Sequence, residues 1–196
     1  MNKINLAVFA STRGTDLQAI IDAKNEGNLE HVNIRLVLSN KADCYALERA
    51  GNAGIKTVFV DPKGKNRLEF DAECLRICQE NEINLIYLIG YMRIISGVLI
   101  SAYQGKILNI HPSLLPKYPG MDLDVHAEVI RNGETESGCT LHFVTEDLDA
   151  GPIFLQEKVE LSKDETPETL KEKVQELEKK LVVKGLVLLS ENKQLN

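Results

Sequence analysis

Short apolar runs alternate with segments of helical periodicity over the first half of the chain. The runs Ile4–Ala10 and Asn84–Gly90 are almost continuously apolar, which is typical of strands covered on both faces. Between the runs, apolar residues recur at helical spacing, as at Leu17, Ile20 and Ile21. This alternation predicts a parallel, doubly wound sheet with right-handed crossovers. The predicted strands are residues 4–10, 33–40, 56–60, 84–90 and 106–110, and the predicted helices are 17–27, 42–54, 67–82 and 96–103.

The pattern changes after Ser137, where two strand-like segments follow each other directly. SGCTLHFV and GPIFLQEKVEL flank the acidic loop TEDLDA, and they predict a hairpin that adds an antiparallel edge to the sheet. A long amphipathic helix then begins near Thr166, with Pro167 at its first position. We expect its apolar stripe to pack on the core, because it is too short for a coiled coil; its members are Leu170, Val174, Leu177 and Leu181.

No repeat, low-complexity tract or linker interrupts the chain. We therefore predict one α/β domain over residues 1–196. It has a Rossmann-like, mostly parallel twisted sheet and an antiparallel C-terminal hairpin.

Composition narrows the classes of function. The chain has 196 residues, of which 43% are hydrophobic, and a net charge of −6. This acidic balance argues against a nucleic-acid or anionic-membrane surface, although it leaves room for a small phosphate ligand.

No segment approaches the roughly 18 apolar residues of a membrane span, and the N-terminus fits a strand better than a signal peptide. The cysteines form no C-x-x-C motif and predict small buried residues in a reduced, cytoplasmic protein without a metal site; they are Cys44, Cys74, Cys78 and Cys139.

Two of the predicted strand ends carry residues suited to a ligand. In an open parallel sheet, ligands bind beyond the carboxyl ends of the strands. After the first strand, ASTRGTDL leads into a helix start that suits a phosphate, or that is a βα turn capped by Thr15 or Asp16. After the fourth strand, IGYMRII places Gly90 and Arg93 at the sheet edge, either as ligand contacts or as a helix start with a snorkelling arginine.

The fifth strand ends in the segment KILNIHPSLLPKYPG, which carries the most specific signal. Asn109 and His111 are two residues apart, so they project to the same side of the strand. An amide donor beside a proton carrier suits a developing oxyanion and a proton transfer. The three prolines that follow predict a stiff wall. A carboxylate is needed to orient the histidine, and spacing alone leaves three candidates open: Glu146, Asp147 and Asp149.

The segments NIHPSLLPKYPG and GCTLHFVTEDLDAGPIFLQ resemble the folate-dependent formyltransferases. The similarity extends from VFASTRGTDLQAIIDA to the C-terminal helix, and it is greatest to the members that formylate glycinamide ribonucleotide. The resemblance implies transfer of the formyl group of 10-formyltetrahydrofolate to the amine of 5'-phosphoribosylglycinamide in purine biosynthesis. It implies a tetrahedral intermediate, no metal, only small-molecule partners, and a monomer or homodimer.

The resemblance also implies a role for individual residues. His111 would be the acid/base, Asn109 would stabilise the oxyanion, and Asp149 would pair with His111 and raise its pKa. His142 would support them. The folate would contact Arg67, Met92, Arg93, Ile94, Ile95, Thr145, Glu146, Asp147, Leu148 and Asp149. The ribonucleotide would contact Gly14, Thr15, Asp16, Gln175 and Glu178.

The chain departs from the family pattern at three places. The family usually has Asn at the position of Asp16, and a carboxylate there repels a nearby phosphate by about 1 kcal/mol or more. The stretch after the proline loop is longer and adds Asp122 and Asp124, and Lys179 replaces a usual His.

Three other functions remain as alternatives. A formyltetrahydrofolate hydrolase would have an additional N-terminal domain. A methionyl-tRNA formyltransferase would have a C-terminal domain and a basic surface. A non-catalytic folate- or nucleotide-binding relative would not need the intact Asn, His and Asp.

Overall fold

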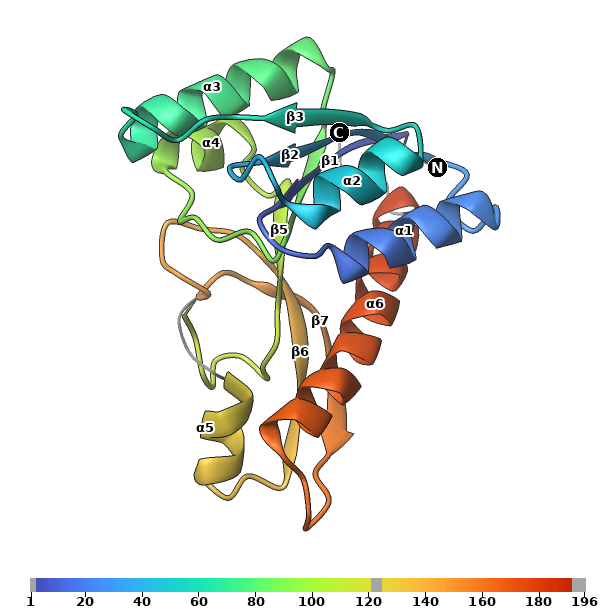
Figure 1. Ribbon diagram of the computed structural model, residues 1–196, viewed down its shortest axis with the longest axis vertical. Helices are drawn as coiled ribbons and strands as arrows, with labels where there is room; N and C mark the ends of the chain where they lie inside the picture. The colour runs from blue at the N-terminus through green and yellow to red at the C-terminus, as the bar shows by residue number, and fades with distance from the viewer. Residues whose placement is uncertain (1–2, 121–124, 192–196) are drawn as a thin grey trace.

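The computed structural model describes residues 3–120 and 125–191 of the chain. Its centre is a seven-stranded sheet in the order β3-β2-β1-β4-β5-β6-β7 (Figure 1). Neighbouring strands from β3 to β5 are parallel, whereas β6 and β7 add an antiparallel hairpin. The strands are β1 (Ile4–Ala10), β2 (Val32–Ser39), β3 (Lys56–Phe59), β4 (Leu85–Ile89), β5 (Ile107–His111), β6 (Glu136–Phe143) and β7 (Ile153–Glu160). The predicted fold class is thereby confirmed.

Helices cover both faces of the sheet, as the continuously apolar strands require. Alternate residues of β1 enter different cores: Leu6 and Val8 pack under α1, α2, α5 and α6, whereas Ala7 and Phe9 pack under α3 and α4. Figure 1 shows α3 and α4 on one side of the parallel strands and α1, α2 and α6 on the other. The helices are α1 (Thr15–Asn25), α2 (Tyr45–Asn52), α3 (Arg67–Glu80), α4 (Gly97–Ala102), α5 (Val125–Arg131) and α6 (Pro167–Glu191).

The structure differs from the sequence predictions in several details. Helix α2 begins at Tyr45 rather than at residue 42, and the short helix α5 was not predicted. In α6, Leu177 is only half-buried, whereas the neighbouring Glu178 is 8% exposed. The packed face of α6 therefore includes a carboxyl group, which an apolar pattern cannot indicate.

The predicted start of α6 matches the structure. The hydroxyl oxygen of Thr166 accepts a hydrogen bond from the Thr169 N–H at 3.3 Å, and Pro167 occupies the first helical position. Within residues 3–120 and 125–191, no helix combines the length and apolar character needed to cross a membrane. Asp122 and Asp124, which make the loop after the prolines longer, lie outside the described residues.

Candidate active site

A cavity of about 230 Å³ opens where the parallel strands end. Strand β4 lies between β1 and β5 in the sheet, so the loops that follow these three strands meet at one edge. Helix α6 crosses the same edge and adds Lys171, Gln175 and Glu178 to the lining. The three strand ends that the sequence singled out therefore contribute to one site.

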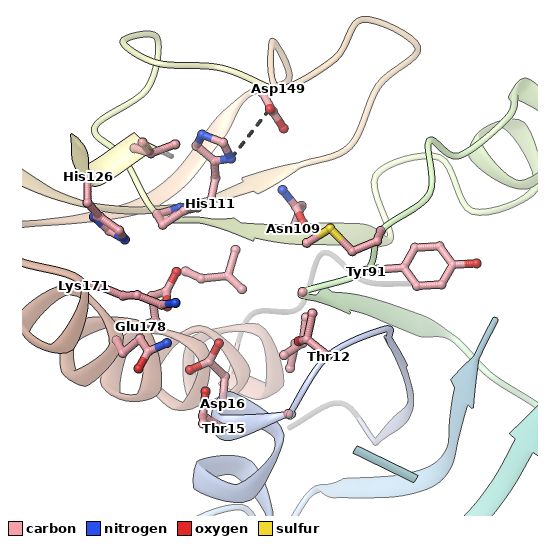
Figure 2. A pocket seen from close by; sticks show the side chains of 18 of the residues that line it. Thr12, Thr15, Asp16, Tyr91, Asn109, His111, His126, Asp149, Lys171 and Glu178 are labelled. Carbon is pink, nitrogen blue, oxygen red and sulfur yellow. Dashed lines mark ion pairs between the residues drawn. The ribbon is translucent and has the colours of Figure 1, made fainter. Parts of the chain in front are cut away.

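Asn109 and His111 both line this cavity from the end of β5. Antiparallel pairing places Asn109 opposite His142 and His111 opposite Thr140 on β6. Figure 2 shows His111 and Asp149 facing each other, with Asn109 beside them. Strand pairing thus holds an amide donor and an imidazole at fixed positions, while the following loop supplies their neighbours.

Both ring nitrogens of His111 have oxygen neighbours. Nε2 lies 2.8 Å from the backbone carbonyl oxygen of Tyr118, and Nδ1 lies 3.6 Å from Oδ2 of Asp149. A carbonyl oxygen only accepts, so Nε2 carries the proton in this contact. In the neutral ring, Nδ1 is therefore the nitrogen that is free to take up a proton, and it does so beside a carboxylate.

Burial lowers the pKa of His111 below its usual value, against the opposing effects of the Tyr118 carbonyl and the Asp149 carboxylate. Asp149 raises the pKa of His111, as the family resemblance implies, but desolvation of the ring outweighs its partners. His111 is consequently neutral near pH 7 and can act as a base. Once protonated, its ring is held by an oxygen on each side.

Asp149 is the acidic residue of its loop that lies against His111. Its side chain is 6% exposed, whereas Glu146 and Asp147 are exposed. Burial alone would raise the pKa of Asp149, but the neighbouring His142 ring, the hydrogen bond from the Gly120 N–H and the charge of His111 lower it. The Gly120 N–H donates to Oδ2 at 2.8 Å. Asp149 is therefore ionised at neutral pH.

His142 links the other two groups. Its Nε2 atom lies 3.2 Å from Nδ2 of Asn109 and 3.5 Å from Oδ1 of Asp149. The ring is 2% exposed, and its Nδ1 atom lies 3.1 Å from the carbonyl oxygen of Phe143. An amide nitrogen has two N–H groups. Asn109 can therefore keep its contact with His142 and direct the second N–H to a ligand.

The loop after β1 forms the opposite end of the cavity. Gly14 is the N-cap residue of α1 with φ 66°, and a Cβ atom there would lie 2.7 Å from Cβ of Ala46. The prediction that Thr15 or Asp16 caps this helix is wrong, because no side chain caps it and both residues fall within its first turn. Close packing of the loop on α2 requires a glycine at the cap instead. The uncapped N–H groups of the first turn can bind an anion.

Two carboxyl groups are buried at this end. Asp16 on α1 is 6% exposed, and Glu178 on α6 is 8% exposed. Burial raises the pKa of Asp16 to about 6, while Lys179 lowers it and Glu176 raises it. Burial and the charge of Asp16 raise the pKa of Glu178. The two groups therefore titrate together rather than independently.

A second, smaller cavity of about 60 Å³ is lined by residues after β4, by Asn109 of β5 and by the loop after β6. Tyr91, Asn109 and Asp149 line both cavities, so the two meet at these residues. The guanidinium of Arg93 stacks 4.0 Å above the ring of Phe70 at the smaller cavity. His142 and a set of apolar and loop residues complete its lining: Leu88, Ile94, Ile95, Val144, Thr145, Glu146, Asp147 and Leu148.

Most residues that the sequence assigned to a ligand gather at these two cavities. Met92 lines the larger cavity, and Arg67 is exposed at the start of α3 and lines neither. The sequence analysis missed Thr12, His126 and Lys171, which line the larger cavity. Lys171 could have been found, because it lies four residues before Gln175 on the same helical face. Within the described part of the chain, no cluster of His, Cys, Asp or Glu side chains could hold a metal ion.

Comparisons with known proteins agree with this arrangement. The formyl transferase family matches residues 4–186. Phosphoribosylglycinamide formyltransferase of Escherichia coli (strain K12) is 41% identical over 88% of this chain and 80% of its own length. The trifunctional purine biosynthetic protein adenosine-3 of Homo sapiens is 43% identical over 97% of this chain, but the chain spans only 19% of that protein.

Solved structures are similar over nearly the whole chain. Glycinamide ribonucleotide transformylase 1 from Symbiobacterium toebii has a TM-score of 0.91 at 38% identity, covering 96% of this chain and 88% of its own. Phosphoribosylglycinamide formyltransferase from Coxiella burnetii, solved in complex with CHES, has a TM-score of 0.91 at 39% identity, with coverage of 97% and 88%. The chain therefore belongs to the formyl transferase family.

Proposed function

We propose that this protein transfers the formyl group of 10-formyltetrahydrofolate to the amine of 5'-phosphoribosylglycinamide, a reaction of purine biosynthesis. The observation that carries the proposal is the junction of the two cavities at Asn109 and Asp149, beside His111. Transfer between two bound molecules requires two compartments that share the reacting groups. The names and the extent of similarity of the relatives support the same reaction.

The ribonucleotide fits the larger cavity. Its phosphate would lie against the first turn of α1, at Gly14, Thr15 and Asp16. Its ribose would face α6, where Gln175 and Glu178 line the wall. Its amine would then reach the junction near Asn109.

The folate fits the smaller cavity. Arg93, Ile94 and Ile95 line one wall, and the loop of residues 145–149 lines the other. Apolar side chains beside a few backbone and polar groups suit a planar heterocycle. In this pose the formyl group on N10 would lie near Asn109, which belongs to both cavities.

The arrangement supports a direct acyl transfer. As the amine of the ribonucleotide attacks the formyl carbon, the formyl oxygen becomes negative and Asn109 donates an N–H to it. Nδ1 of His111 accepts the proton that the attacking nitrogen loses, and the Asp149 carboxylate stabilises the resulting imidazolium. His111 then returns that proton to N10 of the folate as the carbon–nitrogen bond breaks. The proton count closes without a covalent intermediate on the protein.

Hydrolysis of the formyl folate is the second candidate, since it would use the same three side chains. Water needs no binding surface beyond the junction, so hydrolysis does not explain the larger cavity with its uncapped helix start and polar α6 wall. The structure favours transfer for this reason. A purely ligand-binding relative would not need an imidazole held by oxygen atoms on both nitrogens.

We also place the reaction in the cytoplasm, with small molecules as partners and the protein a monomer or homodimer. The four cysteines support the location, because all of them are free and buried, as expected of a reduced compartment.

The test is to follow consumption of 10-formyltetrahydrofolate with and without glycinamide ribonucleotide. We expect consumption to depend on the ribonucleotide, with formylglycinamide ribonucleotide as the product. Release of formate at the same rate in both reactions would contradict the proposal and favour hydrolysis.

A further inference from the structure

Asp16 occupies the end of the larger cavity where the substrate phosphate is proposed to bind. Its side chain is almost fully buried, yet it lines the cavity from the first turn of α1. Its Oδ1 atom is buried and has no hydrogen-bond partner among the residues that the structure describes. A buried carboxylate oxygen without a donor is costly. Asp16 is thus a group whose bonding is incomplete before a ligand arrives.

Glu178 is the second carboxyl group at this end. Helices α1 and α6 pack against each other, and Figure 2 shows Asp16 pointing towards the part of α6 that carries Glu178. The ionised Asp16 makes ionisation of Glu178 more difficult, and burial disfavours the charge of both. Burial and mutual repulsion therefore favour a state in which the two carboxyl groups share one proton over a state in which both are ionised.

The nearby cations do not neutralise this pair completely. Lys179 reaches Asp16 electrostatically, but it forms an ion pair with Glu176. Lys171 lines the cavity and favours the charged form of Glu178.

Other titratable groups face the same cavity from different elements. His111 lies on β5, His126 lies on α5 and Asp149 lies in the loop after β6. Cys139 on β6 is buried, and the nearby Glu178 and Asp16 help to raise the pKa of its thiol, so it remains neutral. Arg13 precedes α1 and is exposed. With one proton on the carboxyl pair, Asp16 therefore still presents a negative charge to a ligand.

A phosphate dianion at the start of α1 conflicts with that charge. A second proton on the pair removes the conflict, because a protonated carboxyl group is neutral and its O–H can donate to a phosphate oxygen. An unphosphorylated ligand carries no charge that would require this change. The carboxyl pair therefore couples ligand charge to proton uptake.

We propose that Asp16 is a specificity-determining residue whose pairing with Glu178 requires the uptake of one proton when a phosphorylated ribosyl ligand binds, but not when its unphosphorylated counterpart binds. This inference rests on the proposed function, since it uses the same pocket for the ribonucleotide. As a consequence, Asp16 weakens phosphate binding as the pH rises.

Titration calorimetry tests this directly. Glycinamide ribonucleotide is titrated into the wild-type protein at pH 7.5 in buffers of different ionisation enthalpy, which gives the number of protons taken up. We expect uptake of about one proton by the wild type and close to none by Asp16→Asn. Burial raises the pKa of Asp16 to about 6. Relative to Asp16→Asn, the wild-type affinity should therefore fall between pH 6 and pH 8, approaching a tenfold loss per pH unit at the upper end of this range.

Two controls isolate the pair. Asp22→Asn makes the same chemical change on the exposed face of α1 and should keep the wild-type proton uptake. The dephosphorylated glycinamide riboside should bind the wild type without proton uptake. Titration of the ligand's own phosphate is common to all the proteins, so the difference between them reports on the carboxyl pair.

The outcomes separate the inference from the proposed function. Ribonucleotide binding with the same proton uptake in wild type and Asp16→Asn would overturn the inference alone. Binding without proton uptake by the wild type would do the same, even if the variant failed to fold. No binding of the ribonucleotide at any pH would overturn the proposed function and this inference together.

Discussion

Replacing Asp149 with asparagine removes one charge beside His111 and keeps the shape of the side chain. The carboxylate oxygen lies 3.6 Å from Nδ1 of His111, and the pair is almost fully buried. At an effective dielectric constant of about 20, two unit charges at this distance attract by roughly 5 kcal/mol. This value is an upper limit, because the Gly120 N–H and His142 also share the charge of Asp149.

Loss of this attraction raises the energy of the transition state, because His111 is taking up a proton there. We expect Asp149→Asn to lower kcat by roughly 10²- to 10³-fold, which corresponds to about 3–4 kcal/mol. The pKa of His111 is already below its usual value, and loss of the carboxylate should lower it further. The acidic limb of the kcat/KM profile, where His111 becomes protonated, should therefore move to lower pH.

The assay is the initial rate of formyl transfer from pH 5 to 9, with thermal unfolding as a measure of integrity. Asp147→Asn is the matched control, since it changes an exposed carboxylate in the same loop and should leave the limb where it is. A folded Asp149→Asn protein with a rate within tenfold of wild type and an unmoved acidic limb would refute the assigned role of Asp149.

Three further substitutions, the last with a matched control, test the site and the fold. Asn109→Ala should lower kcat by roughly 10²- to 10³-fold with little change in Tm, and near-wild-type turnover would remove it as the oxyanion donor. His111→Ala should lower kcat by roughly 10²- to 10⁴-fold and abolish the acidic limb, so a retained limb would assign it to another group. Gly185→Ala should lower the free energy of unfolding by about 1–3 kcal/mol in denaturant titrations, because the added Cβ would lie 2.5 Å from Leu141 on β6. Gly51→Ala, in a helix with nothing within 4 Å, should instead be stabilising by about 0.5–1 kcal/mol, and equal effects would contradict the packing argument.

Local patterns were sufficient to predict the sheet. Parallel strands buried on both faces appear as continuous apolar runs, and the alternation within β1 shows why, since neighbouring residues enter different cores. The position of Asn109 and His111 at a strand end was also predictable, because a strand fixes the direction of residues two apart.

The partners of these residues depend on distant parts of the chain. The choice of Asp149 over its acidic neighbours depends on a loop in which Asp149 itself has φ 52° and receives a hydrogen bond from Gly120. The N-cap of α1 depends on the close approach of Ala46, so spacing alone favoured the wrong residues. The burial of Glu178 beside Asp16 depends on the packing of α6 on α1. None of these contacts leaves a signal in local periodicity.

A single-turnover experiment with a ¹³C-labelled formyl group on the folate tests the central claim most directly. Excess protein is mixed with limiting labelled 10-formyltetrahydrofolate and glycinamide ribonucleotide, and the quenched products are resolved by NMR. Because Asn109 and Asp149 line both cavities, the account predicts that the label passes to the ribonucleotide amine in a one-to-one ratio with folate consumed. Recovery of the label as free formate would contradict the account.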